Sequence, residues 1–537
     1  MKKLIITLGC IATTILFIRC SEGFLDRTPP GTGTVEGFYN SEDELVFGIN
    51  GVYQTFQGDW WAGGFVHLQP HLEGATENGK VCCAWEHGIV QLATGTTNPT
   101  TGGFTQYKWI WGFRAITRIN QLLAVMEEGV PELNQENMNK WEGELKFLRA
   151  FVYQQLIFYY GDVPLITTPL TPEEASAKGR TPKSEILDLI LLDLDFAIAN
   201  LSISPNRDDF GRPTSQAASA LKGKTLLYAE RWSDAASAFE SVIALEGGAV
   251  SLDPDFESLF RGLNEQSSEI LFSLQYVGEG QVGAGQGEGT MMQTHYAPTA
   301  QPDGLGAGWS SLLHSYKMRD AFYMTDGLPI DQSPLYDAAL PFENRDPRMG
   351  MTFLIPGNRP DGTPYSTFRG FPVEPDWIVM SGIPASQWVG AAGFGTKKWV
   401  TEFDDTGFSD DFSQDFILIR YSDVLLMYAE ARNEASGPDG MVYDALNKIR
   451  ARVGMPDFPP GLSQGEMREE IRHERNVELA MEGVHYNDLL RWRIAETVIT
   501  SLPEFESRIF DPSKHYLWPI PQSAIDSNPN IAQNPGY

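Results

Sequence analysis

The sequence predicts a mostly α-helical protein, a single large body in which tetratricopeptide-like helix pairs support a loop-rich face. Three observations lead to this fold class. Apolar residues recur at helical spacing over several long stretches, two stretches show the pattern of paired helices, and a long central stretch has no helical period. The chain of 537 residues is 42% hydrophobic, which is ample material for a large core.

Long helices are predicted in the first third of the chain. In residues 113–129 the apolar side chains recur every three or four positions, and Gly129 ends the run. The stretch "LRAFVYQQLIFYYGDVPLI" at 148–166 is apolar on two adjacent faces. We expect a helix that is buried on most sides, ends at Gly161 and cannot continue past Pro164. Its aromatic residues are therefore predicted to be core.

Residues 219–243 have the pattern of a tetratricopeptide-type helical hairpin. Gly223 falls on the first helix, while Ala235 and Phe239 have the Ala-x3-Phe spacing of the second. A second pair is predicted at 416–435 followed by 442–456, where a similar spacing recurs and Pro456 ends the run. Small residues at such positions let two helices approach closely, so we expect helix pairs both before and after the middle of the chain.

The middle of the chain is rich in glycine and proline and carries several tryptophans. Loops of this length in a compact protein are usually functional or disordered, and the recurring tryptophans favour ordered surface loops. The predicted divisions are an export signal at 1–19, a tether at 20–35, a helical part at 36–275, a loop-rich region at 276–415 and a second helical part at 416–537.

The N-terminus has the layout of a lipoprotein export signal. Two lysines precede an apolar run that is shorter than the roughly 20 residues needed to span a bilayer. The run ends at Cys20, which we expect to become the acylated N-terminus of the mature protein. Arg19 departs from the usual pattern of a small residue before the cysteine, and Cys10 is a rival site that would leave half of the apolar run on the mature chain. Several acyl chains would anchor the protein without a transmembrane helix.

Charge and cysteine content exclude several classes of function. The formal net charge of −30 repels phosphate backbones and anionic lipid headgroups, so nucleic acid is not an expected partner. Once Cys10 and Cys20 are assigned to the N-terminus, only the adjacent Cys82 and Cys83 remain, and we interpret them as two small buried thiols. No cysteine and histidine spacing predicts a metal site, and no cofactor is expected.

The sequence offers one candidate for catalysis, a set of carboxylates near the C-terminus. No nucleophile elbow, zinc helix or complete calcium loop is present. Glu474, Glu478 and Glu482 recur every four residues, so they stack on one helical face, as a pair of glycosidase carboxylates could. Nearby arginines (Arg472, Arg475, Arg491 and Arg493) would keep these carboxylates ionised, which favours a structural ion-pair network. We therefore predict no catalytic residues and no enzyme activity.

Several motifs together resemble the SusD/RagB-like outer-membrane lipoproteins. They are "CSEGFLDRTPP" after the signal, "GELKFLRAFVYQQLIFYYGDVPLIT", "IRYSDVLLMYAEARNE", "ALNKIRARVGMP", "RHERNVELAMEGVHYNDLLRW" and the terminal "YLWPIPQSAIDSNPNIAQNPGY". The resemblance covers essentially the whole mature chain. His485 departs from the family, which more often has arginine there, and we expect this to weaken the ion-pair network slightly.

The resemblance implies a lipid-anchored protein on the outer surface of a Gram-negative cell. Such proteins cap a SusC-like TonB-dependent transporter in the outer membrane, bind nutrients, most often glycans, and do not cleave them. Alternatives are capture of a non-glycan nutrient such as a peptide, a secreted glycoside hydrolase, and a helical scaffold that binds proteins alone.

Aromatic residues in irregular segments are the candidates for glycan contact, because sugar rings rest their C–H faces on aromatic side chains. No family motif transfers to these positions. The candidates are Trp60, Trp61, Trp85, Tyr296, Trp309, Trp377 and Trp388. By contrast Trp141, Trp232, Trp492 and Trp518 lie in helical or signature segments, where we expect core packing.

Overall fold

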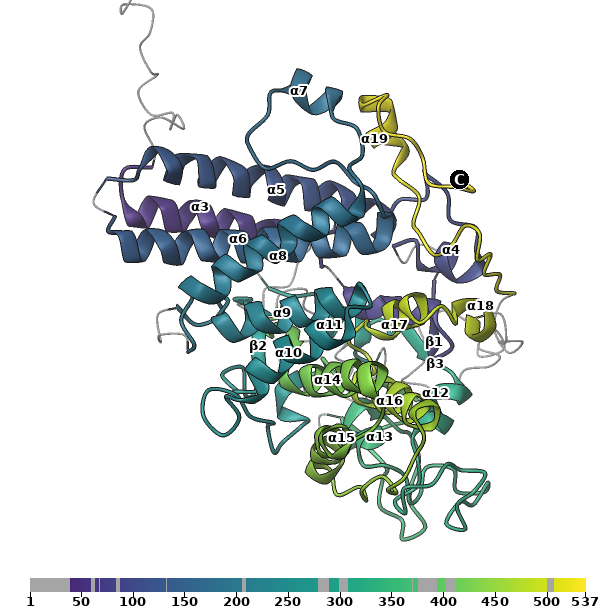
Figure 1. Cartoon of the computed structure of the whole chain (residues 1–537). Helices are drawn as coiled ribbons and strands as arrows, with labels where there is room; N and C mark the ends of the chain where they lie inside the picture. Colours follow the sequence, from purple (N-terminus) through teal and green to yellow (C-terminus); the bar gives the residue numbers. More distant parts are fainter. Residues whose placement is uncertain are drawn as a thin grey trace, which may run out of the picture.

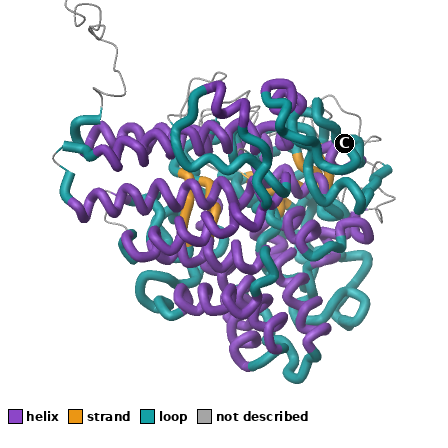
Figure 2. Tube along the Cα trace, turned by 45° about the horizontal axis from the view of Figure 1, so that its top comes forward, coloured by secondary structure: helices purple, strands orange, loops and turns teal. Residues whose placement is uncertain are grey.

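A computed structural model of the chain describes residues 39–58, 63–66, 68–83, 87–131, 133–204, 209–278, 289–298, 308–368, 370–374, 394–401, 412–499 and 507–537. Helices dominate these residues, and the few strands are short segments among them (Figures 1 and 2). The mostly helical prediction is confirmed. No helix in the described part of the chain is long and apolar enough to cross a membrane.

Long helices at one end of the molecule lie side by side, as Figure 1 shows in purple and blue. They are α3 (Glu42–Gln57), α5 (Phe104–Glu128), α6 (Gln135–Tyr160) and α8 (Lys183–Asn200). Along the chain, each of these helices packs against the next. The Asn134 side chain caps the start of α6 by accepting from the Asn137 N–H, and Gly161 ends it with a φ of +72°. The 148–160 stretch is mostly buried, as predicted.

The stack continues through the predicted helical hairpin. It consists of α9 (Ser215–Tyr228) and α10 (Trp232–Ile243). Helix α8 packs against α9, and α10 packs against α14 (Tyr421–Ser436). A Cβ placed on Gly223 would come within 2.4 Å of the Phe239 ring, so only glycine permits this close approach. Ala235 and Phe239 are fully buried. The residue pattern that predicted the hairpin therefore reflects a real packing requirement.

The second helical part is built on α14. Its helices are α14 (Tyr421–Ser436), α15 (Gly440–Arg452), α16 (Gln464–Glu478), α17 (His485–Arg491), α18 (Ala495–Val498) and α19 (Gln522–Ser527). Both α15 and α16 pack on α14. The prediction was wrong for residues 416–420, which form strand β8 (Phe416–Arg420) and pair antiparallel with β2 (Ile270–Leu274). This strand pair lies buried against α9 and α14 and joins segments that are far apart in the sequence.

Short elements fill the remaining described segments. They are α4 (Ile89–Thr94), α7 (Pro172–Ala177), α11 (Met292–Tyr296), α12 (Tyr316–Ala321), α13 (Arg348–Thr352), the 3-10 helices η2 (Gln69–Ala75) and η4 (Ser258–Phe260), and strands β1 (Gly79–Val81), β3 (Leu312–His314), β4 (Phe353–Leu354), β5 (Thr367–Phe368), β6 (Phe371–Pro372) and β7 (Gly395–Thr396). Antiparallel pairing of β1 with β3 brings the 79–81 segment beside residues 312–314 of the loop-rich region. The predicted division boundaries stay predictions.

Candidate functional site

Two of the predicted ligand-binding aromatics lie in one cluster of rings. This His–aromatic cluster consists of His71 on η2, His87, His295 and Tyr296 on α11, and Trp309. The ring centroid of His295 is 5.0 Å from that of His71 and 4.9 Å from that of Trp309. The His87 ring lies 5.9 Å from His71 and 6.0 Å from His295. Segments that precede α5 in the sequence and segments that follow α10 therefore meet in this cluster.

The two predicted residues differ in exposure. Tyr296 lies at the end of α11 and is buried, and its hydroxyl is 2.7 Å from His71 Nδ1. The sequence had indicated an irregular, partly exposed setting for it. Trp309 is half-buried, and its backbone N–H donates to the Thr294 carbonyl at 2.7 Å, which fixes it beside α11. Trp309 is thus partly accessible to a ligand, while Tyr296 is buried and contacts His71.

The other predicted positions, Trp60, Trp61, Trp85, Trp377 and Trp388, lie outside the described residues, as does the lipidation site Cys20. In the sequence, Trp85 is only two residues before His87. Sequence reasoning missed the three histidines of the cluster. Their only signal was their position beside loop aromatics, because their spacing matches no known motif.

No metal centre is evident among the residues that the structure describes: no group of three or more His, Cys, Asp or Glu side chains has a suitable arrangement. Cys82 and Cys83 both carry thiols, with Cys83 buried and Cys82 half-buried. The His–aromatic cluster combines flat apolar surface with imidazole and phenol groups. Such a combination can stack against a ring and hydrogen-bond its substituents.

The glutamates considered as catalytic candidates lie in a buried ion-pair network. Glu478 pairs through Oε1 with Arg420 Nη1 at 2.7 Å and with Arg452, and through Oε2 with Arg348 Nη1 at 3.0 Å. All four side chains are nearly inaccessible to solvent. Burial opposes ionisation, but the three guanidiniums prevail and hold the pKa of Glu478 far below its usual range. This carboxylate cannot supply a proton near neutral pH, so it is not suited to act as a general acid.

The rest of the network explains why these glutamates are charged and buried. Glu474 accepts from Arg348 and Arg450, and Glu482 accepts from Arg420 and from Lys398, whose Nζ lies 2.7 Å away. The structural ion-pair network is therefore present, but its guanidiniums come from α13, β8 and α15, not from the nearby positions that the sequence suggested.

Of the four arginines named from sequence, two take part in a neighbouring network. Arg475 pairs with Asp423 and Asp488, and Arg491 pairs with Asp488 and Glu430. Burial alone would raise the pKa of Asp488, but these two guanidiniums lower it to about 2. Arg472 and Arg493 are not members of either network.

His485 keeps a positive charge in place of the family's arginine. Its Nε2 lies 2.8 Å from Glu77 Oε1. Burial lowers the pKa of the imidazole, but Glu77 more than compensates and the pKa is about 9. This histidine is cationic at neutral pH, and its partner Glu77 belongs to neither network, so the expected weakening of the network stays a prediction.

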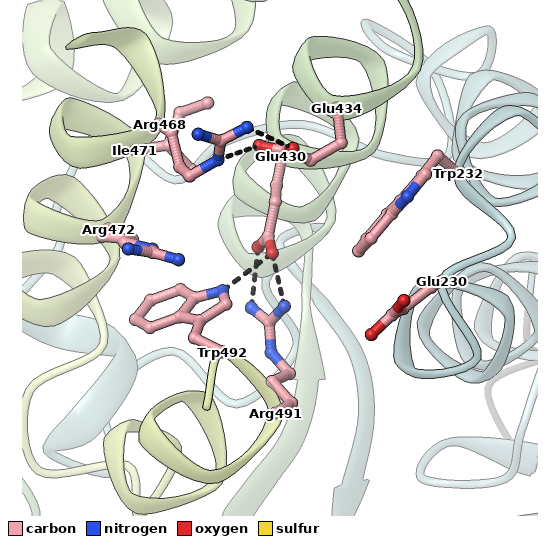
Figure 3. Close-up of a pocket in the computed structure, with 9 residues that line it drawn as sticks. All are labelled: Glu230, Trp232, Glu430, Glu434, Arg468, Ile471, Arg472, Arg491 and Trp492. Carbon is pink, nitrogen blue, oxygen red and sulfur yellow. Dashed lines mark hydrogen bonds and ion pairs between the residues drawn. The ribbon is translucent and has the colours of Figure 1, made fainter. Parts of the chain in front are cut away.

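Two tryptophans assigned to the core from sequence line a surface cavity instead. Trp141 and Trp518 are buried as predicted, with Trp518 stacked on Tyr159 at a centroid separation of 3.9 Å. Trp232 and Trp492 are half-buried and lie on opposite sides of a cavity of about 170 Å³, shown in Figure 3. Part of Trp232 packs against the core as predicted, but neither tryptophan is fully buried, because Trp232 begins α10 and Trp492 follows α17, at helix ends where the packed stripe stops.

Comparison with known proteins matches two family models to the chain. A model described as "SusD family" matches residues 268–537, and one described as "Starch-binding associating with outer membrane" matches residues 24–227. Together they cover most of both predicted helical parts, with residues 228–267 in neither match. The first model alone spans half of the chain.

Relatives and solved structures agree with these models. SusD-like protein P2 of Formosa agariphila is 25% identical, with both chains fully covered, and a SusD-like protein of Bacteroides ovatus is 23% identical over 90% of this chain and 81% of its own. A SusD-like protein of Bacteroides fragilis superposes with a TM-score of 0.78 at 24% identity, covering 93% of this chain and 98% of that one. A structure described as a laminarin-binding SusD-like protein gives 0.74 at 25% identity, covering 93% and 100%. The chain belongs to the SusD family.

Proposed function

We propose that this protein is a cell-surface lipoprotein that binds glycans and delivers them to a SusC-like TonB-dependent transporter in the outer membrane. The observation that carries the proposal is the His–aromatic cluster, in which half-buried Trp309 presents ring surface beside three imidazoles. Sugar rings need flat apolar surface and nearby hydrogen-bonding groups, and the cluster has both.

Family membership supports a glycan as the ligand. One matching model is described as starch-binding and associated with the outer membrane, and one similar structure binds laminarin. The division into a signal at 1–19, a lipid-anchored tether at 20–35 and a central region at 276–415 that carries the ligand face fits the same role. Trp60, Trp61, Trp85, Trp377 and Trp388 are proposed as further ligand contacts.

The protein binds its ligand without cleaving it. The buried network supports this part of the proposal, because Glu478 is ionised and enclosed by three guanidiniums. A glycosidase needs a carboxylic acid that keeps its proton near neutral pH.

Binding is tested with the chain that lacks residues 1–20, by affinity gel electrophoresis and calorimetry against laminarin, starch, xylan and mannan. We expect one of these polysaccharides to bind. Replacing Trp309→Ala should weaken that binding at least about fivefold, since aromatic contacts contribute roughly 1 kcal/mol or more. Leu192→Ala, an exposed apolar residue on α8, is the control and should leave affinity unchanged. Binding of a peptide mixture with no polysaccharide bound would replace the glycan by a peptide ligand.

The membrane anchor and the transporter are tested with the full chain in its own cells. Labelled palmitate should enter the wild-type protein, and Cys20→Ala should abolish labelling and release the protein from the outer membrane. Detergent extraction followed by affinity purification should recover a TonB-dependent barrel with the lipidated protein. Recovery without any barrel would contradict delivery to a transporter, and labelling that persists in Cys20→Ala would point to Cys10.

A further inference from the structure

The cavity between Trp232 and Trp492 is lined by none of the residues of the His–aromatic cluster. It forms where the α9–α10 turn meets α14, α16 and the end of α17 (Figure 3). Its volume of about 170 Å³ is below the roughly 300–1,000 Å³ of pockets for drug-sized ligands, so it suits a single ring.

One wall of the cavity is held rigidly by ion pairs. Glu430 accepts from Trp492 Nε1 at 2.8 Å and pairs with Arg491, whose Nη2 lies 2.7 Å from Glu430 Oε2. Next to it, Arg468 forms two 2.7 Å hydrogen bonds with Glu434. Because these groups satisfy one another, they fix the shape of the wall without offering free charge to a ligand.

The opposite wall offers groups that are not engaged. Within the described residues, the Trp232 indole has no hydrogen bond, ring contact or cation–π contact, and the exposed Glu230 carboxylate has no ion pair. Trp232 is half-buried, so one part of its ring is packed and the rest faces the cavity. The two residues together provide a flat apolar surface and a hydrogen-bond acceptor.

Arg472 provides a hydrogen-bond donor on the side of the cavity opposite Trp232 and Glu230. Its Nε is buried and has no hydrogen-bond partner. Its Nη1 pairs at 2.8 Å with Glu469, whose side chain is 69% exposed, so that pair contributes little. Because the Nε is inaccessible, the donors that a ligand in the cavity can reach are the Nη groups of Arg472, whose side chain is 21% exposed and whose guanidinium lies 5.0 Å from the centroid of the Trp492 ring.

The charge of the lining favours a neutral ligand. Three glutamates and three arginines line the cavity, so an added anion or cation meets a like charge on one side. A ligand that has both donors and acceptors and one flat apolar face matches Glu230, Arg472 and Trp232 together. A pyranose ring has these properties.

We propose that this cavity is a second saccharide subsite that holds one pyranose unit, stacked on Trp232 and hydrogen-bonded to Arg472 and Glu230. The proposal rests on the proposed glycan-binding function and adds a contact point outside the His–aromatic cluster. A polysaccharide chain that touches both points would be retained longer than by either alone, because the second contact becomes intramolecular.

The test uses protein labelled with 5-fluorotryptophan, in which fluorine NMR separates the indole signals. The Trp232 and Trp309 signals are assigned from their loss in Trp232→Phe and Trp309→Phe. The probes are the methyl β-glycosides of glucose, galactose, mannose and xylose, titrated to their solubility limits. We expect at least one probe to shift the Trp232 signal saturably, including in Trp309→Phe.

Two variants identify the polar contact. Arg472→Gln should weaken the binding seen at Trp232 roughly tenfold, whereas Glu469→Gln, which removes only the exposed partner, should not weaken it. Circular dichroism checks that both variants are folded. Equal effects of the two variants would overturn the assignment of Arg472.

The outcomes separate the two proposals. A shift at Trp309 with none at Trp232 would overturn the second subsite and leave the proposed function in place. A shift at Trp232 alone would support the subsite and count against the His–aromatic cluster as the main site. No shift at either tryptophan would overturn the subsite, and with no polysaccharide bound in the gel assay it would overturn glycan binding as well.

Discussion

The substitution Glu478→Gln should destabilise the fold strongly and should cause no loss of hydrolytic activity. In the native protein three guanidiniums, those of Arg348, Arg420 and Arg452, share this carboxylate in the core. The amide has nearly the same shape, but it removes the negative charge and places an N–H₂ group against cations. Breaking a buried ion pair by removing one partner costs about 3–5 kcal/mol, so we expect a loss of that size in the free energy of unfolding.

The assay is urea unfolding followed by tryptophan fluorescence, beside a polysaccharide hydrolysis assay of the same samples. Glu469→Gln is the matched control, because Glu469 is mostly exposed and its pair with Arg472 should contribute less than about 1 kcal/mol. Similar urea midpoints for the two variants would refute the structural role of Glu478. A stable Glu478→Gln variant that loses a hydrolytic activity present in the wild type would show that this residue is catalytic.

Two further predictions concern pH and close packing. The folded pKa of His485, about 9, lies above its unfolded value of 6.5, so the pair with Glu77 contributes about 3 kcal/mol to the free energy of unfolding. This contribution is fully present below pH 6.5 and is lost as the pH rises through 9. The unfolding free energies of the wild type and His485→Gln should therefore converge at high pH, and a difference that stays constant with pH would contradict the assignment. Gly223→Ala should destabilise the fold by about 1–3 kcal/mol, because the added Cβ would clash with Phe239. The control is Gly465→Ala on α16, where the added Cβ would meet no neighbouring atom within 4 Å, and it should be neutral or stabilising. Equal urea midpoints for the two variants would contradict the packing argument.

The helices could be predicted because their signals are local. Apolar spacing, Gly161 after α6 and the Gly223 and Phe239 pair each act within one element or one hairpin. Strand β8 could not be found in this way. The strand runs directly into α14 with no residue between them, and its strand state depends on β2, which lies about 150 residues earlier in the chain.

The ion-pair network shows the same limit at the level of side chains. The sequence correctly indicated that Glu474 and Glu478 would be neutralised by guanidinium groups. It favoured arginines that are near in sequence, but the partners Arg348 and Arg420 come from α13 and β8, which only the tertiary fold brings to α16. Composition predicts that charges will be paired, whereas the fold decides with which partners.

Hydrogen bonding separates tryptophans that the sequence could not distinguish. Trp232 and Trp492 both lie in helical segments and are both half-buried at helix ends. Glu430 engages the indole N–H of Trp492, while no described residue engages that of Trp232. Since a half-buried indole with a free N–H gains from a ligand and an engaged one does not, Trp232 is the member of this pair whose replacement should alter binding without altering the fold.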